Sequence, residues 1–308
     1  MFTLSARKCV LVFLLVAIVC LSTGFLIGRY RYRRQTLAPP TQAQAIHLNR
    51  YYHFTELMRD PAIECELLRY KSGYDQSEQA MFIMRPVDRK PERVFFFFHG
   101  MDGDCGDAVV VRELVKRLNA TVISVGGRGP SWVSDAFMAD AEQVIRSRQK
   151  DFAGYYLMGI SMGGTQALAL AGALPADLRA SVLGVIALIP GSNLPAIAAS
   201  SSSEDVRRTL QASVGGNAQM LERRSPVQLL DQYKPDLPFA IFYDQQDTLL
   251  LTPELEKFVA ALRSKHHPVT TFATSGDHSF SFSDFDYQEV VEKLGSNSVE
   301  NKVPLLSN

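Results

Sequence analysis

Residues 155–164 have the sequence Tyr-Tyr-Leu-Met-Gly-Ile-Ser-Met-Gly-Gly, and this stretch decides the fold that the sequence predicts. Its apolar first half is typical of a buried strand, and the Ala- and Leu-rich residues 162–173 that follow favour a helix. Ser161 stands at the junction, between Gly159 and Gly163. A tight turn at this serine needs both glycines, because a Cβ at either position would collide with neighbouring backbone. Gly-x-Ser-x-Gly alone is a weak signal, but its place between a strand and a helix strengthens it.

Strands and helices alternate along the chain from residue 63 to residue 294. Residues 94–98 hold four consecutive phenylalanines and predict a strand that is buried on both faces. Alternation with short connections predicts the α/β class, with a mostly parallel central sheet flanked by helices. We expect strands at residues 63–70, 80–87, 94–98, 121–125, 155–160, 181–189, 239–243 and 269–273, and helices at residues 107–118, 133–149, 162–173, 253–264 and 285–294.

The first 34 residues predict a membrane anchor. Residues 9–28 contain no charged side chain, and as a helix of about 1.5 Å per residue they would span the roughly 30 Å of a bilayer core. A cleaved signal peptide is the alternative, but this apolar run exceeds the usual core of about 7–15 residues. The flanking charges leave open on which side of the membrane the remaining chain lies. The flanking basic residues are Arg7, Lys8, Arg29, Arg31, Arg33 and Arg34.

The rest of the chain divides into four predicted parts. Residues 35–62, with Ala-Pro-Pro-Thr near their start, are predicted to be a linker and lead-in to the folded domain. Residues 63–295 are predicted to form one α/β domain, interrupted at residues 191–236 by a segment with a serine run, a Gly-Gly pair and short helical pieces. Residues 296–308 predict a polar, disordered tail.

The charge distribution excludes one class of function. The formal net charge is zero, but residues 1–34 carry six basic and no acidic side chains. The remainder therefore carries 26 basic against 32 acidic side chains, a formal charge of −6. A mildly acidic body argues against bulk binding of nucleic acid. Four cysteines in the whole chain rule out a disulfide scaffold and a cysteine-rich zinc site.

The strand, turn and helix around Ser161 resemble the α/β-hydrolase superfamily of serine hydrolases. In that family an earlier strand ends in His-Gly, and here His99 and Gly100 follow the phenylalanine run. The resemblance implies that Ser161 is the nucleophile and that the backbone N–H groups of Met101 and Met162 form the oxyanion hole. It also implies that the side chain of His99 braces the loop, because the family uses the backbone at this place.

The resemblance further implies an acid and a base, in the chain order serine, acid, histidine. His278 lies just beyond the last predicted core strand, where the family places its base. Asp247 lies four residues past the strand at residues 239–243 and is the favoured acid. Asp244 stays open as an alternative, because Tyr243 and Asp244 occupy the places where the family has histidine and glycine.

These residues imply an enzyme that forms an acyl-enzyme on Ser161, with His278 as the base and Asp247 orienting the imidazole. Neither a metal nor an organic cofactor is needed for that chemistry. The expected substrate is a small-molecule or lipid-like carboxylic ester or thioester. An acyltransferase or a peptidase on the same fold, and a catalytically silent fold that serves as a binding or scaffold module, are alternatives.

The resemblance also places a cap at residues 191–236, over the carboxyl ends of the strands. At about 46 residues this cap is modest in size. Its apolar residues 194–199 would either cover an acyl chain or pack as core, and the sequence leaves both interpretations open.

Two loops hold further candidates for substrate binding. Arg128 follows the strand at residues 121–125 and would bind a carboxylate or phosphate of the substrate, or pair with an acid nearby. Trp132 lies in the same loop and is the second candidate. Asp102 and Asp104, beside the predicted oxyanion loop, would make that side of the mouth negative and disfavour anionic substrates.

Overall fold

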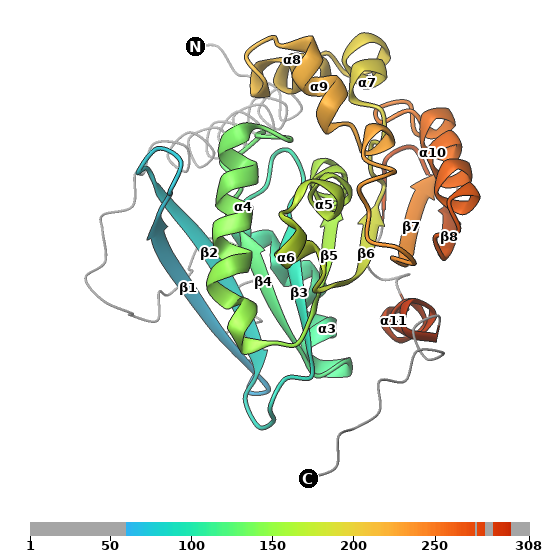
Figure 1. The fold of residues 1–308 in the computed structure, drawn as a ribbon. Helices are drawn as coiled ribbons and strands as arrows, with labels where there is room; N and C mark the ends of the chain where they lie inside the picture. Colours follow the sequence, from blue (N-terminus) through green and yellow to red (C-terminus); the bar gives the residue numbers. More distant parts are fainter. Residues whose placement is uncertain (1–59, 275, 281–285, 297–308) are drawn as a thin grey trace, which may run out of the picture. The chain divides into compact units, whose positions relative to one another are not determined.

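The computed structural model describes residues 60–274, 276–280 and 286–296, and in this part of the chain eight strands form one sheet (Figure 1). The strands lie in the order β1-β2-β4-β3-β5-β6-β7-β8. β2 is antiparallel to both of its neighbours, and all other neighbouring strands are parallel. The predicted mostly parallel sheet is therefore confirmed. The strands are β1 (Ile63–Lys71), β2 (Glu78–Pro86), β3 (Arg93–Phe98), β4 (Ala120–Val125), β5 (Tyr155–Ile160), β6 (Val182–Leu188), β7 (Phe239–Asp244) and β8 (Val269–Thr274).

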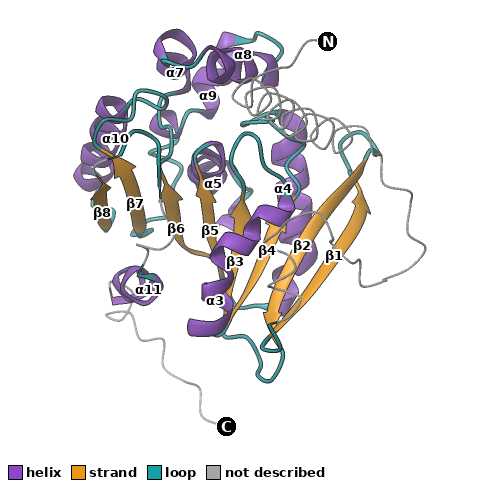
Figure 2. Ribbon diagram, turned by 180° about the vertical axis from the view of Figure 1, so that it is seen from behind, coloured by secondary structure: helices purple, strands orange, loops and turns teal. Residues whose placement is uncertain are grey.

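Helices cover both faces of this sheet (Figure 2). The helices α4, α5 and α10 contribute to the core on one face, and η1, α3 and α11 to the core on the other. The α-helices are α3 (Arg112–Arg117), α4 (Asp135–Arg148), α5 (Met162–Ala173), α6 (Ala176–Arg179), α7 (Leu194–Ser200), α8 (Glu204–Ser213), α9 (Ala218–Arg224), α10 (Thr252–Ser264) and α11 (Tyr287–Ser296), and the 3₁₀ helices are η1 (Cys105–Val111), η2 (Gln149–Asp151) and η3 (Pro226–Gln228).

The strand β3 shows why both faces of the sheet are covered. Successive side chains of a strand point to opposite faces. Phe96 and Phe98 accordingly lie in the core with α4 and α5, whereas Phe95 and Phe97 lie in the core with η1 and α11. None of the four is more than 1% exposed. Burial of each phenylalanine contributes roughly 1.5–3 kcal/mol, so this strand is stable only between two covering layers.

The predicted elements match the observed ones to within two residues at each end, with one exception. Residues 107–118 were expected to form one helix, but they lie in a 3₁₀ helix, η1, which begins at Cys105, and the short α-helix α3. The side chain of Asp104 accepts a hydrogen bond from the N–H of Gly106 at 2.7 Å and so starts η1 early. The three consecutive valines at residues 109–111 disfavour a regular α-helix because they are β-branched.

The inserted segment at residues 191–236 contains α7, α8, α9 and η3. Each of its α-helices begins with a polar cap. The side chains of Asn193, Ser203 and Asn217 accept hydrogen bonds from the N–H three residues further on. Such caps stabilise short helices, which explains how this polar segment forms three of them.

The helix α7 joins the inserted segment to the main core. Its residues Leu194 and Ile197 are fully buried and lie in the same core cluster as α5 and α10. Of the two interpretations that the sequence left open for residues 194–199, the structure therefore supports packing as core.

The predicted anchor at residues 9–28 and the predicted tail at residues 296–308 lie outside the described residues, except for Ser296, which ends α11. The predicted linker at residues 35–62 is described only from residue 60 onward. Of the helices that the structure does describe, none has the length and apolar character needed to cross a bilayer.

Candidate active site

Ser161 lies between the end of β5 and the start of α5, at the carboxyl edge of the parallel strands (Figure 1). Its backbone has φ 56° and ψ −119°, a conformation that a residue with a Cβ rarely adopts. The N–H of Ser161 donates to the carbonyl oxygen of Leu188, at the end of β6, at 2.8 Å. This hydrogen bond ties the strained turn to the neighbouring strand.

The glycines beside Ser161 are required by close backbone contacts. A Cβ at Gly159 would lie 2.1 Å from the carbonyl oxygen of Gly163. A Cβ at Gly163 would lie 2.0 Å from the carbonyl oxygen of Phe98. Both distances are far below van der Waals contact, so the predicted reason for the two glycines is confirmed. The second contact also shows that the start of α5 lies directly against the end of β3.

Ser161, His278 and Asp247 meet at this edge of the sheet. The hydroxyl oxygen of Ser161 lies 2.8 Å from Nε2 of His278, and Nδ1 of His278 lies 2.7 Å from Oδ2 of Asp247. Asp247 is 6% exposed, and its other oxygen, Oδ1, accepts hydrogen bonds at 2.9 Å from the N–H groups of Leu249 and Leu250. Those two bonds fix the carboxylate so that Oδ2 faces the imidazole.

Asp244, the alternative acid, has a different position. Its Oδ2 accepts a hydrogen bond from the backbone N–H of Ser279 at 2.6 Å, and its carbonyl oxygen accepts one from the hydroxyl of Thr252 at 2.6 Å. The structure thus places Asp247 against the imidazole of His278, and Asp244 against the backbone of Ser279, the residue after this histidine. Asp244 holds the loop that carries His278, whose own φ is 56°. The spacing after the strand favoured Asp247 as the acid, but nothing in the sequence indicated that Asp244 would bind the backbone of Ser279.

The two predicted oxyanion-hole residues flank Ser161. Met101 lies in the loop after β3 and lines the same cavity as Ser161. Met162 is the first residue of α5, and an N–H group in the first turn of a helix has no acceptor within that helix. Both backbone positions are thus compatible with donation to an oxyanion.

His99 braces the loop that carries Met101. Its Nδ1 lies 2.6 Å from the carbonyl oxygen of Gly100, and its Nε2 lies 3.0 Å from the carbonyl oxygen of Gly126 in the loop after β4. The side chain is buried. Gly127 packs on the same ring, since a Cβ there would lie 2.4 Å from Nε2. The expected structural role of this histidine is confirmed.

A cavity of about 430 Å³ lies beside Ser161 and His278, a volume that suits a small organic ligand. Its apolar wall belongs mostly to the core side formed by η1 and α11. Within the described part of residues 191–236, no residue lines it. The apolar lining residues include Phe97, Val110, Ile160, Ile189 and Phe280.

The acidic side of the mouth differs in part from the prediction. Asp102 lines the cavity, as expected. Asp104 does not line it, because its side chain caps η1. Asp107 lines the cavity instead. The sequence predicted that this residue begins a helix but did not predict where its side chain points.

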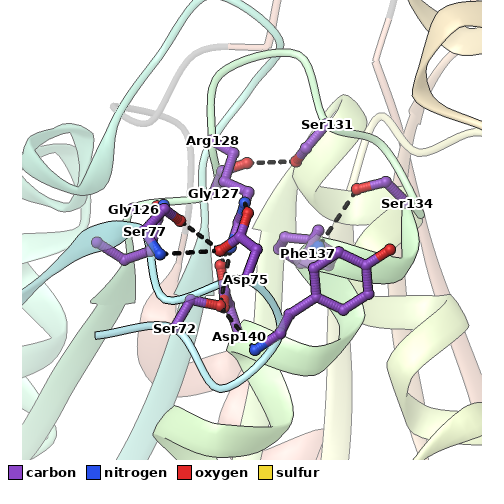
Figure 3. A network of polar contacts seen from close by, with 12 residues as sticks. Ser72, Asp75, Ser77, Gly126, Gly127, Arg128, Ser131, Ser134, Phe137 and Asp140 are labelled. Carbon is purple, nitrogen blue, oxygen red and sulfur yellow. Dashed lines mark hydrogen bonds and ion pairs between the residues drawn. The ribbon is translucent and has the colours of Figure 1, made fainter. Parts of the chain in front are cut away.

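Arg128 does not line the cavity, and its guanidinium is held by acids nearby (Figure 3). Its Nε donates to Oδ2 of Asp140 at 2.6 Å, and its Nη1 to Oδ2 of Asp75 at 2.7 Å. Nη2 donates to the hydroxyl of Ser72 at 2.8 Å. The guanidinium holds the pKa of Asp75 well below its usual range through these hydrogen bonds. Arg128 therefore joins the β1–β2 turn to α4, and of the two roles that the sequence left open for it the structure shows pairing with nearby acids and not a place in the cavity wall.

Trp132 is likewise not a lining residue. It is 1% exposed, and its indole N–H donates to the hydroxyl of Thr209 in α8 at 3.1 Å. Its backbone N–H lies 3.3 Å from the sulfur of Met162. The indole is thus core that joins the inserted segment to the loop after β4, and its predicted contact with substrate is corrected.

Comparisons of the sequence find no relatives, since no protein-family model matches the chain and no curated protein matches it. Solved structures do match. A thermostable esterase from Pseudomonas putida is 18% identical, with a TM-score of 0.59 over 80% of this chain and 85% of that one. The fluorophosphonate-binding serine hydrolase F of Staphylococcus aureus is 16% identical, with a TM-score of 0.60 over 76% of this chain and 98% of that one.

An acylaminoacyl peptidase of Pyrococcus horikoshii is 15% identical, with a TM-score of 0.58 over 81% of this chain but only 42% of that one. Identities this low show the fold alone. The chain therefore has the α/β-hydrolase fold that the motif around Ser161 implied.

The network around Arg128 predicts a difference between its two acids. Asp140→Ala removes a carboxylate that is 2% exposed and leaves part of a largely buried guanidinium unpaired. We expect the free energy of unfolding to fall by about 3 kcal/mol. Asp75→Ala, at a side chain that is 38% exposed, should cost less. Chemical denaturation of both variants measures the difference, and equal losses would contradict the larger cost that we expect at the buried carboxylate.

Proposed function

We propose that this chain is a serine hydrolase that cleaves a carboxylic ester or thioester through an acyl-enzyme on Ser161. The observation that carries the proposal is the continuous path from the hydroxyl of Ser161 to Nε2 of His278 and from Nδ1 to the buried carboxylate of Asp247. A cavity beside the hydroxyl gives a substrate access to it.

In the first step, Oγ of Ser161 bonds to the acyl carbon while Nε2 of His278 takes the hydroxyl proton. The electron pair of the carbonyl moves to its oxygen, which the N–H groups of Met101 and Met162 stabilise; one such donor contributes roughly 3–4 kcal/mol in the transition state. Asp247 stabilises the imidazolium. Collapse of the intermediate breaks the bond to the leaving group, which takes the proton from Nε2 as an alcohol or thiol.

In the second step, water attacks the acyl-enzyme with His278 again as base, and Ser161 recovers its proton. An alcohol in place of water would give an acyltransferase, which is the nearest alternative because only the exclusion of water separates the two outcomes.

We favour an ester or thioester over a peptide as the substrate because this chain matches nearly the full length of an esterase but less than half of a peptidase. The Pseudomonas putida esterase matches over 85% of its chain, whereas the Pyrococcus horikoshii peptidase matches over 42% of its chain. The larger part of that peptidase therefore has no counterpart in the match.

A catalytically silent binding module is the alternative from another class. Ser161 keeps a strained backbone and a hydrogen bond to His278, and Asp247 buries a carboxylate for that same imidazole. Strain and buried charge both cost stability, so their retention favours catalysis.

The N-terminal residues carry the second part of the proposal, a single-pass anchor at residues 9–28 that attaches the hydrolase to a membrane. Full-length protein should then need detergent for its release from cell membranes, and a chain without residues 1–34 should not. Release of the full-length chain by alkaline carbonate would contradict the anchor. Protease protection in sealed vesicles determines the side.

The nucleophile can be tested with a fluorophosphonate probe. The probe should label the folded chain, and Ser161→Ala and His278→Ala should abolish labelling and lower kcat on esters by about 10⁶. Ser264→Ala, an exposed serine of α10, is the matched control and should keep full labelling. Failure of the folded wild-type chain to react would refute the hydrolase.

The two acids should respond differently to the same substitution. Asn keeps an acceptor oxygen, which is all that the N–H of Ser279 requires of residue 244, but it cannot stabilise the imidazolium of His278. Asp247→Asn should therefore lower kcat by about 10⁴, and Asp244→Asn should lower it far less. Steady-state kinetics compares the two variants. A larger loss in Asp244→Asn would reverse their roles.

A further inference from the structure

The carboxylate of Asp107 lies in the wall of the same cavity as Ser161 and His278. Its position is fixed by the 3₁₀ helix η1, in which the N–H of Asp107 donates to the carbonyl oxygen of Asp104 at 3.0 Å. The carboxylate packs over Gly103, where a Cβ would lie only 1.9 Å from Oδ2. The glycine thus makes room for an acid at this point of the wall.

Within the described residues, no lysine or arginine forms an ion pair with the carboxylate of Asp107 or of Asp102, and the hydrogen bond that acts on the Asp107 carboxylate comes from the backbone of Asp104. The carboxylate of Asp104 itself accepts the N–H of Gly106. The cavity wall holds no lysine or arginine in its described part, and His278 is its one basic side chain there. Two acids therefore face the cavity, and no described lysine or arginine lines it beside them.

Holding Asp107 in this position has a cost for the fold. Burial, and to a lesser degree the negative charge of Asp104, raise the pKa of Asp107, while His99 and a hydrogen bond from the backbone of Asp104 oppose them only in part. A raised pKa means that the ionised carboxylate is less favourable in the folded protein than in water. A partly buried acid that no described lysine or arginine neutralises, in a cavity that contains a nucleophile, is typical of a functional position.

We propose that this cavity selects substrates that carry an alkylammonium group, with Asp107 as the main recognition residue and Asp102 as a weaker one at the rim. The inference rests on the proposed hydrolase function and adds its substrate class. The remaining wall, with Phe97, Val110 and Phe280, is apolar. An alkylammonium group, whose charge is surrounded by hydrocarbon, fits acids set in an apolar wall.

A metal ion fits this wall less well. In the part of the chain that the structure describes, no three acidic, histidine or cysteine side chains converge as metal ligands would. Asp104 is also turned away to cap η1. The aspartates therefore suit a single organic cation rather than a strongly hydrated ion.

The charge of the substrate also matters for the reaction. When Ser161 attacks, negative charge develops on the acyl oxygen in the same cavity as the carboxylate of Asp107, and the two repel. A cation on the substrate offsets that repulsion, so it favours the transition state as well as binding. An anionic substrate would add to the repulsion.

Two pairs of esters test this inference. One pair is a choline ester and the ester of its all-carbon isostere, in which a quaternary carbon replaces the nitrogen, so that the cation lies in the alcohol. The second pair places a trimethylammonio group, or its all-carbon counterpart, in the acyl chain. We expect the wild type to prefer the cationic member of at least one pair in kcat/KM, and Asp107→Asn to lower that preference about tenfold. Asp102→Asn should lower it less, because the side chain is exposed.

Asp88→Asn is the matched control. It removes the same charge from an exposed residue in the loop between β2 and β3, at the opposite edge of the sheet from Ser161, and should leave the preference unchanged. Asp107→Asn should also raise the unfolding temperature at neutral pH, because it removes an unfavourable charge. That gain separates loss of recognition from loss of folding.

The outcomes separate the two proposals. If the probe labels Ser161 and both pairs are hydrolysed without a preference that depends on Asp107, the inference is overturned and the hydrolase stands. If neither the probe nor any ester reacts with the folded chain, the hydrolase is refuted, and the substrate class with it.

Discussion

The close contact between the start of α5 and the end of β3 is the constraint on which the site depends. A Cβ at Gly163 would lie 2.0 Å from the carbonyl oxygen of Phe98 and 2.6 Å from that of His99. The loop with Met101 begins at once after these residues, so this backbone contact brings the loop close to Ser161, and the side chain of His99 then braces it. No side chain fits at residue 163, because even a Cβ atom would overlap the carbonyl oxygen of Phe98. The rest of the site adds groups to this arrangement.

The two aspartates that follow β7 divide one task between them. Asp247 fixes the imidazole of His278, and Asp244 fixes the loop backbone at Ser279. A histidine with φ 56° on a loop needs such support, because the backbone conformation is unfavourable and the ring has to meet two partners at once. His278 lies on a loop and not on a helix or strand, and this explains why buried acids are needed at both residue 244 and residue 247.

The sequence predicted the strands because burial leaves strong local patterns, whereas the order of Ser161, Asp247 and His278 was implied by the resemblance to the α/β-hydrolase superfamily. The sequence did not resolve Arg128, whose partners Asp75 and Asp140 come from the β1–β2 turn and from α4. It also did not show that Trp132 points into the core. Position in a loop after a strand indicates which edge of the sheet a residue occupies. The direction of its side chain depends on which other loops pack at that edge of the sheet, and the local sequence pattern does not predict those contacts.

The same limit explains Asp107. An ordinary α-helix was expected over residues 107–118, but the cap at Asp104 and the valines at residues 109–111 give a 3₁₀ helix that starts at Cys105. Asp104 is the N-cap of this 3₁₀ helix and its side chain is used by the helix itself, whereas Asp107, in the first turn, lies at the cavity. Since no described residue of the inserted segment at residues 191–236 lines that cavity, we expect substitutions in the loop after β3 and in η1 to change the substrate choice of this chain more than substitutions in α7, α8 and α9.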